Sequence, residues 1–440
     1  MTAGSEALRY FVRTFGCQMN ENDSEHIAGV LEGMGLVAAG RPEEADVVIV
    51  NTCAVREKSE EKLYSYLGRL AALKRARRVL IGVAGCVAQL KRAELLEKKP
   101  YLDFVVGPGG YHELPRILAQ AFDKPCVRTE WSAVWTEFEA GTAVRESPVS
   151  AFVPVMEGCD NFCAYCVVPF TRGRERSRPS SGVLCEVRSL AAGGYKEIQL
   201  LGQNVNSYRD PEKALGFAAL LDEVCAVEGV EWVRFLTSHP RDLGEDLIRA
   251  MERNPRICRQ IHLPLQSGST RVLEKMNRGY GREDYLSLAG RLQERLPGIL
   301  LSTDVIVGFP GETEEDFEAT CDVLRRVRFA NIFSFRYSPR PLTAAVKVPD
   351  DVPLEVKRRR LVALQGLQRS IQIGINRSFV GREVRVLCHG PSAKGGGRFA
   401  GRTEGGQVVN FEAAGDPTGR FVEVRITGCG PYSLHGRSSA

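Results

Sequence analysis

The chain lacks any apolar run of the roughly 20 residues that a bilayer-crossing helix needs, so nothing in it supports a membrane role. Its first residues, Met1 to Glu6, lack the basic and apolar character of a secretory leader. It also lacks a large excess of charge of one sign, because 59 Lys and Arg residues accompany 54 Asp and Glu residues. These absences predict a cytoplasmic protein with no membrane partner.

Cysteine is plentiful, but its pattern does not suit a disulfide framework. There are 13 cysteines in 440 residues, an odd number in a chain long enough for two or three domains with their own cores. Reduced thiols are therefore expected, as in other cytosolic proteins. Reduced cysteines that lie close together are candidates for metal ligands.

Three cysteines, Cys159, Cys163 and Cys166, fall within eight residues in a C-x3-C-x2-C pattern. Three thiolates leave a cubane iron-sulfur cluster one ligand short, whereas clusters for simple electron transfer are held by four cysteines. The iron without a protein ligand is then open to a small molecule, as is the open position of a catalytic zinc. A zinc knuckle and a chance group of buried cysteines remain the alternatives.

The first 125 residues alternate short apolar strands with helical patterns, which predicts a doubly wound parallel α/β domain. The predicted strands are residues 10–14, 47–50, 79–83 and 104–106. Asp23 or Ser24 is expected to cap the first helix, and Gly35 to end it.

A second cysteine triad follows from this arrangement. Cys17, Cys53 and Cys86 each follow one of the first three predicted strands. The carboxyl ends of parallel strands share one edge of a sheet, so these cysteines are expected to converge there. Zinc and three unrelated buried cysteines are the alternatives.

Three further regions complete the predicted organisation. Residues 126–150, with Trp131 and Trp135, have the polar composition of a linker. Six strand-like runs separated by helical patterns then predict an incomplete (β/α)6 barrel, open on one side. These runs are residues 152–156, 197–201, 232–236, 260–265, 300–307 and 331–336. After a basic helical segment, Gly-rich turns between alternating strands predict a small C-terminal β-barrel.

The C-x3-C-x2-C pattern, with Tyr165 directly before its last cysteine, resembles the signature of the radical S-adenosylmethionine superfamily. The whole chain resembles the methylthiotransferases, and it is most similar to the tRNA-2-methylthio-N6-dimethylallyladenosine synthases, often called MiaB. The segments that carry this resemblance are GCQMN at 16–20, DSE at 23–25, NTC at 51–53, REK at 56–58, GCVA at 85–88, EGC at 157–159, VVPFTRG at 167–173, LGQNVN at 201–206, TSHP at 237–240, HLPLQSG at 262–268, DVIVGFPGE at 304–312, GRTE at 401–404 and VVNF at 408–411. The chain departs from the family at Leu342 and Ala344, where Gly and Pro are usual, so the turn there is not predicted.

The resemblance implies four regions. These are an N-terminal methylthiotransferase domain at 8–125, the linker at 126–150, a radical S-adenosylmethionine domain at 151–373 and an OB-like, RNA-binding TRAM domain at 374–438. It implies two 4Fe-4S clusters, one on Cys159, Cys163 and Cys166 and an auxiliary one on Cys17, Cys53 and Cys86. Two S-adenosylmethionine molecules are expected per turnover. One gives a 5′-deoxyadenosyl radical, and the other methylates sulfur at the auxiliary cluster.

Residues at the carboxyl ends of the barrel strands are expected to hold the cofactor, because such barrels carry their sites on that face. The candidates are Tyr165, Gly202, Gln203, Asn204, Ser238, His239, Gln266, Ser267, Asp304 and Tyr337. His239 has an alternative as a hydrogen-bonded structural residue before a proline. Arg172, Arg174, Arg176 and Arg178 are expected either to meet phosphates of a polyanion or to be ordinary surface arginines.

The implied substrate is tRNA carrying isopentenyladenosine at position 37 of the anticodon loop, where carbon 2 receives a methylthio group. The implied partners are a reductant such as flavodoxin or ferredoxin and a sulfur donor, and we expect a monomer. Alternatives from related families are methylthiolation of a ribosomal protein aspartate or of threonylcarbamoyladenosine in tRNA. A more remote alternative is a non-enzymatic regulator that binds RNA and carries an iron-sulfur cluster.

Overall fold

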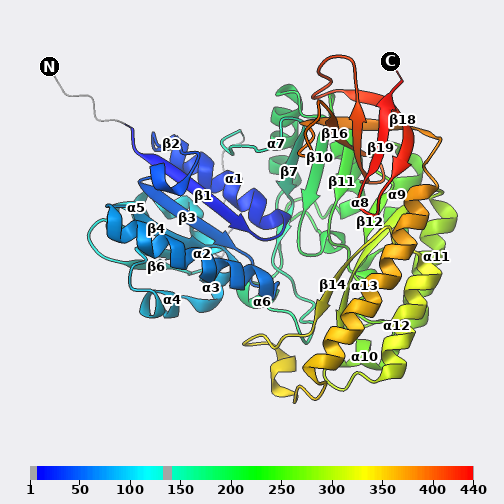
Figure 1. Ribbon diagram of the computed structural model, residues 1–440, viewed down its shortest axis with the longest axis horizontal. Coiled ribbons are helices and arrows are strands. Elements are labelled where there is room, and N and C mark those ends of the chain that lie inside the picture. Colours follow the sequence, from blue (N-terminus) through cyan, green and yellow to red (C-terminus); the bar gives the residue numbers. More distant parts are fainter. Residues whose placement is uncertain (1–6, 132–140, 440) are drawn as a thin grey trace. The chain divides into compact units, whose positions relative to one another are not determined.

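The structure is a computed structural model that describes residues 7–131 and 141–439, so Trp135 lies outside the described residues (Figure 1). The chain divides into two compact units, which we describe separately. The first consists of Met1–Glu146, Met156–Asp160 and Cys166–Arg178, and the second of Ser147–Val155, Asn161–Tyr165 and Pro179–Ala440. In the described ranges, none of the helices has the length and apolar character needed to span a membrane.

The first unit contains a parallel sheet with the strand order β2-β1-β3-β4-β5-β6. The strands are β1 (Arg9–Phe15), β2 (Val37–Ala38), β3 (Val47–Thr52), β4 (Leu80–Ala84), β5 (Phe104–Val106) and β6 (Cys126–Arg128). The order reverses between β1 and β3, and ligands of open α/β sheets bind at the carboxyl end of such a switch point. β6 lies in the range that we expected to be a linker.

Helices cover both faces of this sheet. Ile27 and Leu31 of α1 share one apolar core with Leu114 and Ile117 of α5, while Leu63 of α2 belongs to a second core. The elements are α1 (Gln18–Gly33), η1 (Pro42–Glu44), α2 (Glu57–Ala76), α3 (Cys86–Lys91), α4 (Glu94–Lys98), η2 (Pro108–Glu113) and α5 (Leu114–Ala121). The unit also includes β8 (Met156–Glu157), α6 (Val168–Thr171) and β9 (Arg176–Ser177). The prediction of a doubly wound parallel domain is confirmed.

The start of α1 was predicted wrongly. The helix begins at Gln18, with Cys17 as its N-cap, so Asp23 and Ser24 are buried within it and do not cap it. Asn20 makes this start possible because its side chain accepts the Cys17 backbone N–H at 3.4 Å, as in a capping box. Gly35, with φ of +84°, follows the end of the helix as expected.

The second unit contains six parallel strands in two three-stranded sheets, β11-β10-β7 and β12-β13-β14. An isolated bridge links Val233 of β11 to Ile257, which lies just before β12, and the Ser238 N–H donates to the His262 carbonyl at 3.2 Å. The strands are β7 (Ser150–Pro154), β10 (Glu197–Leu201), β11 (Trp232–Phe235), β12 (Gln260–His262), β13 (Leu300–Val307) and β14 (Asn331–Arg336). Helices separate or follow the strands, which confirms the partial (β/α)6 barrel. They are α7 (Ser180–Ala192), α8 (Phe217–Cys225), α9 (Glu245–Arg253), α10 (Thr270–Lys275), α11 (Arg282–Arg295), α12 (Glu314–Val327) and α13 (Leu354–Arg377), with short turns η3 (Val205–Ser207), η4 (Pro240–Asp242) and η5 (Ala344–Lys347).

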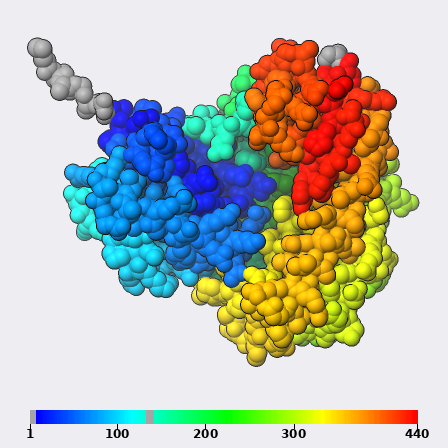
Figure 2. All heavy atoms as spheres, in the orientation of Figure 1, coloured from blue at the N-terminus to red at the C-terminus, as the bar shows by residue number. Residues whose placement is uncertain are grey.

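The same unit ends in a closed five-stranded barrel with the order β15-β16-β17-β19-β18, as predicted. Its strands are β15 (Glu383–Pro391), β16 (Phe399–Thr403), β17 (Val408–Glu412), β18 (Phe421–Cys429) and β19 (Leu434–Ser438). Its atoms, drawn in orange to red, form one compact mass (Figure 2). Arg234 of β11 fixes this barrel by donating to the carbonyls of Thr403 and Glu404, both at 2.6 Å.

Candidate active site

The structure brings Cys17, Cys53 and Cys86 to the carboxyl edge of the first unit's sheet, where they follow β1, β3 and β4. A hydrogen bond from the Cys53 thiol lowers the pKa of Cys17 to about 6, with help from the charge of Arg172. The hydrogen bond with Cys17 and burial raise the pKa of Cys53, and the charge of Cys86 adds to this rise, so all three thiols influence one another. The prediction that these distant cysteines share one edge is therefore matched by their positions.

Two asparagines and one glycine hold the three cysteine turns against each other. The Asn20 side-chain amide donates to Asn51 Oδ1 at 3.1 Å, and the Asn51 amide donates to the Asn20 carbonyl at 2.9 Å. Gly85, directly before Cys86, has φ of +88°, and a Cβ there would lie 2.2 Å from Asn51 Oδ1. Both asparagines are fully buried, so these turns have little freedom to move apart.

Arg172 lies beside this triad and does not reach solvent. It is 2% exposed, and it donates to Asp23 Oδ1 at 3.1 Å and to Glu157 Oε1 at 3.4 Å. The expectation that Arg172 meets phosphates or is a surface arginine is wrong, because its charge is neutralised inside the first unit. Arg174 and Arg176 form ion pairs with Asp160 and Glu157, and Arg178 is buried.

The loop of the other triad is held by backbone and side-chain contacts within each unit. In the first unit, the Cys159 N–H donates to the Gly173 carbonyl at 3.3 Å and the Val168 N–H to Cys166 Sγ at 3.4 Å. In the second unit, Cys163 Sγ accepts from Arg278 NH1 at 3.2 Å. No three His, Cys, Asp or Glu side chains in the described ranges are already arranged to hold a metal ion, so both ligand sets stay predictions.

Several predicted cofactor residues lie where β10 and β11 end. Gly202 and Gln203 follow β10 directly. Asn204 joins the two strand ends, because its amide donates to Asp242 Oδ2 at 2.7 Å and its Oδ1 accepts the His239 N–H at 3.0 Å. Ser238 Oγ is buried and has no hydrogen-bond partner among the described residues.

His239 is held as a neutral imidazole. Burial, reinforced by the charges of Arg278 and Arg241, lowers its pKa to about 2. Its Nδ1 accepts the Arg241 backbone N–H at 3.3 Å, so the ring proton lies on Nε2. Nε2 is buried without a partner in the described structure, which argues against the purely structural alternative.

The remaining candidates follow or belong to β12, β13 and β14. Gln266, with φ of +71°, donates its N–H to the Asp304 carbonyl at 2.8 Å. Ser267 Oγ accepts the Ser269 N–H at 3.3 Å. Tyr337 follows β14 and belongs to a small apolar core against which Tyr165 packs, and its buried hydroxyl has no partner within the described ranges.

Two residues that we had not chosen also belong here. Both polar side-chain atoms of Asn206 are buried without a partner in the part of the chain that the structure describes. Arg278 contacts both Cys163 and Tyr165. Asn206 lies in the LGQNVN segment after β10, and that segment was the available signal for it. Arg278 lies in the short loop after α10, and no signal in the sequence distinguished it.

These groups suit the cofactors that the sequence suggests. Sets of three thiols are soft ligands of the kind that iron-sulfur clusters use. Buried polar atoms without partners are costly unless a ligand supplies hydrogen bonds, and Ser238, His239, Asn206 and Tyr337 offer such atoms. The donor set therefore fits a cluster together with a polar small molecule.

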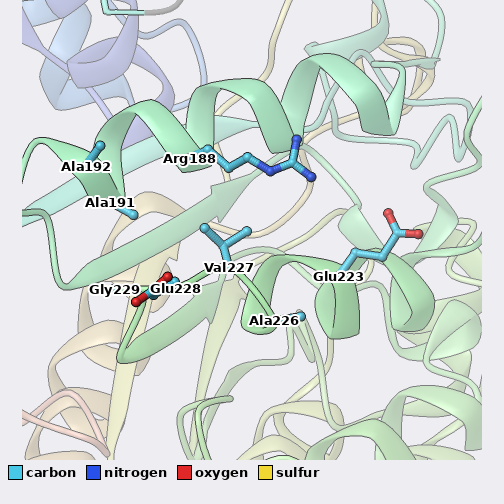
Figure 3. A pocket seen from close by; sticks show the side chains of 8 residues that line it. All are labelled: Arg188, Ala191, Ala192, Glu223, Ala226, Val227, Glu228 and Gly229. Carbon is cyan, nitrogen blue, oxygen red and sulfur yellow. The ribbon is translucent and has the colours of Figure 1, made fainter.

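A cavity of about 580 Å³ lies elsewhere, between α7 and α8, and contains none of the predicted residues (Figure 3). Ala191, Ala192, Ala226 and Val227 give it apolar walls, with Arg188 and Glu223 beside them. The end of α7 and the turn at Gly229 place it at the amino ends of β10 and β11, which is opposite to the candidate site.

Three family models match successive parts of the chain. Residues 9–107 match the Uncharacterized protein family UPF0004, residues 153–324 the Radical SAM superfamily and residues 377–438 the TRAM domain.

Three curated relatives carry the name tRNA-2-methylthio-N(6)-dimethylallyladenosine synthase. The one from Geobacter metallireducens is 47% identical and covers 97% of both chains. The one from Acetivibrio thermocellus is 46% identical over 97% of this chain and 90% of the relative, and that from Clostridium novyi is 44% identical over 97% and 96%.

Two solved structures share the fold. The radical S-adenosylmethionine methyltransferase TsrM from Kitasatospora setae superposes with a TM-score of 0.55 at 16% identity, covering 88% of this chain and 79% of that one. The cobalamin-dependent S-adenosylmethionine radical enzyme OxsB gives 0.51 at 12% identity, covering 83% of this chain and 56% of that one.

Proposed function

Because this chain belongs to the family of tRNA-2-methylthio-N(6)-dimethylallyladenosine synthases, we propose that it adds a methylthio group to carbon 2 of isopentenyladenosine at position 37 of tRNA. It is a radical S-adenosylmethionine enzyme by its central region. The observation that carries the proposal is the presence of two cysteine triads, one at the carboxyl edge of the α/β sheet and one in the loop that follows β8, in a chain that ends in a TRAM barrel.

In this proposal Cys159, Cys163 and Cys166 hold one 4Fe-4S cluster, and Cys17, Cys53 and Cys86 hold the auxiliary one. When bound, the two clusters and S-adenosylmethionine supply a radical route to an unactivated aromatic C–H bond and a sulfur atom for transfer. Tyr165, Gly202, Gln203, Asn204, Ser238, His239, Gln266, Ser267, Asp304 and Tyr337 remain the proposed cofactor residues.

The chain's own side chains would bind and orient a polar cofactor at the barrel. The neutral His239 offers an Nε2–H donor. The orientation of its imidazole ring is fixed because its Nδ1 accepts the Arg241 backbone N–H. Asn204 fixes the His239 backbone from the end of the neighbouring strand. The Ser238 hydroxyl, fully buried next to it, adds a second hydrogen-bonding group that water does not reach.

We extend the proposal to partners and boundaries. The C-terminal barrel binds tRNA, a small protein such as flavodoxin or ferredoxin supplies electrons, and a sulfur donor renews the transferred atom. We propose that the enzyme acts as a cytoplasmic monomer that uses two S-adenosylmethionine molecules per turnover. We propose the domain limits predicted from the sequence, except that β6 extends the first domain into the expected linker.

Substrate competition tests the assignment. The reconstituted enzyme is incubated anaerobically with dithionite, S-adenosylmethionine and an equal mixture of isopentenylated tRNA, threonylcarbamoylated tRNA and the ribosomal protein with the candidate aspartate. We expect a methylthio product on the isopentenylated tRNA alone. Product on another substrate would reassign the enzyme within the methylthiotransferases, and no cleavage of S-adenosylmethionine would favour a regulator.

A further inference from the structure

Arg278, in the loop that follows α10, is buried against the cysteine loop. It is 4% exposed. Its NH1 donates to Cys163 Sγ at 3.2 Å and to the Tyr165 hydroxyl at 3.4 Å, while NH2 donates to the Pro264 carbonyl at 3.0 Å. Its Nε donates to the Tyr280 hydroxyl at 3.0 Å. The guanidinium is thus held at a fixed place by four different groups.

Among the residues that the structure describes, no carboxylate balances the charge of Arg278. Within the described ranges none of its hydrogen bonds reaches an acidic side chain, and no ion pair includes it. Other buried arginines of the same unit differ, since Arg234 pairs with Glu197 and Arg360 with Glu312. A buried charge is costly unless an opposite charge lies beside it, so Arg278 calls for an anion near Cys163.

The segment around Arg278 also sets the shape of the cysteine loop. The Met276 carbonyl accepts the Ala164 N–H at 2.9 Å. The Asn277 side chain, from a residue with φ of +56°, donates to the Phe162 carbonyl at 3.2 Å. Three consecutive residues therefore contact the loop on both sides of Cys163, and the distance from the guanidinium to the sulfur is built into the fold.

We propose that Arg278 is the built-in counter-charge of the iron-sulfur cluster on Cys159, Cys163 and Cys166, and that it favours the reduced state of that cluster. The inference rests on the proposed function, because it requires a cluster on these cysteines. One-electron reduction adds a negative charge to a group that already carries three thiolates, and a nearby fixed cation stabilises the added charge. Net charge and hydrogen bonds to sulfur are known determinants of cluster potentials. Arg278 is a positioning residue that acts through the cluster.

The test uses a full-length chain with Cys17→Ala, Cys53→Ala and Cys86→Ala, so that only the cluster of interest is present. Arg278→Met, Arg278→Lys and the control Arg271→Met are each placed in this background. Arg271 belongs to the neighbouring α10, but its charge already pairs with Asp316. After reconstitution, iron content is measured, and a redox titration followed by electron paramagnetic resonance gives the midpoint potential without S-adenosylmethionine.

Arg278→Met is expected to lower the equilibrium constant for reduction at least about tenfold, which is a shift of about 59 mV to a more negative potential for one electron. Arg278→Lys should recover most of the shift because it restores the charge, and Arg271→Met should leave the potential unchanged. If Arg278→Met binds no iron, Arg278→Lys is compared with Arg278→Gln instead. The midpoint potential of Arg278→Gln is then expected to be the more negative of the two.

An unchanged potential in the charge-removing variant would overturn the inference. A variant that weakens S-adenosylmethionine binding but keeps the parental potential would also overturn it, and would assign Arg278 to the cofactor carboxylate. If the parent chain, in which Cys159, Cys163 and Cys166 are intact, binds no cluster, the proposed function fails instead. The two failures are therefore distinguishable.

Discussion

Asn20 and Asn51 are joined by two hydrogen bonds inside the first unit, one of 3.1 Å from the Asn20 amide to Asn51 Oδ1 and one of 2.9 Å from the Asn51 amide to the Asn20 backbone carbonyl. Asn20 lies three residues after Cys17, and Asn51 lies two residues before Cys53. Gly85 packs on the same pair directly before Cys86. Three turns that are far apart in the sequence are thus fixed by one small polar cluster, which we regard as the support of the auxiliary ligand set.

Asn51→Ala should remove this support. The substitution leaves the buried Asn20 amide without an acceptor, and the expected cost is about 2 kcal/mol of unfolding free energy. Iron bound after reconstitution should fall from about eight toward about four atoms per chain, since each cluster holds four. Asn376→Ala is the control, because Asn376 is also buried, belongs to the second unit and donates to the Gly430 carbonyl. Full iron content in Asn51→Ala would contradict the role.

Gly85→Ala should be more harmful than Gly35→Ala. Both glycines have positive φ, +88° and +84°, so both substitutions introduce backbone strain of about 1 kcal/mol. Only Gly85 is crowded, because its Cβ would approach Asn51 Oδ1 to 2.2 Å, while nothing lies within 4 Å of that of Gly35. Thermal unfolding and iron content of the two variants measure the difference. Equal losses would show that the contact has no importance.

His239 should stay neutral across the working pH range. Its pKa is lowered to about 2 by burial, whereas an unfolded histidine titrates near its ordinary value of about 6.5. Below pH 6.5 the unfolded chain binds a proton on this histidine and the folded chain does not. Each further unit by which the pH falls therefore lowers the unfolding free energy by roughly 1.4 kcal/mol. Nitrogen NMR of histidine-labelled protein, with His239→Gln for assignment, should show no titration between pH 8 and 5.5. A titration near 6.5 would refute the buried, neutral state.

Leu342→Gly should stabilise the protein. Leu342 has φ of +69° and is 62% exposed, so it has left-handed backbone strain and little burial to lose. Relief of that strain is expected to exceed the entropy cost of glycine by about 1 kcal/mol. Val362→Gly, at an exposed position within α13, is the control and should destabilise. Denaturant unfolding measures both, and a less stable Leu342→Gly variant would count against the strain.

Strands and cysteine positions were predictable because they depend on local patterns. Residues 197–201, 300–307 and 331–336 were predicted with the bounds that β10, β13 and β14 have, since each is an apolar run bounded by turns. Cys17, Cys53 and Cys86 could be placed at one edge because parallel strands share their direction. The turn at Leu342 was not predicted, and the structure gives this residue a positive φ of +69°.

The start of α1 and the role of Arg172 were not predictable, because both depend on contacts between distant residues. The Asn20 side chain accepts the Cys17 backbone N–H at the start of the helix. Nothing in the sequence around Asn20 indicates this role. Arg172 reads as one of a series of alternating arginines, but it is buried against Asp23, which lies 149 residues earlier in the chain. The environment of Arg278 likewise depends on distant residues. Only the structure shows that its described hydrogen bonds reach a thiol, hydroxyls and a carbonyl, and no carboxylate.

The central claim is that the two cysteine triads have separate tasks in one reaction on tRNA. Wild type, Cys17→Ala and Cys163→Ala are incubated anaerobically with dithionite, S-adenosylmethionine and isopentenylated tRNA, and nucleosides and 5′-deoxyadenosine are measured by mass spectrometry. We predict methylthiolated nucleoside from wild type alone, 5′-deoxyadenosine from wild type and Cys17→Ala, and neither from Cys163→Ala. Methylthiolated nucleoside from Cys17→Ala, or 5′-deoxyadenosine from Cys163→Ala, would contradict the account.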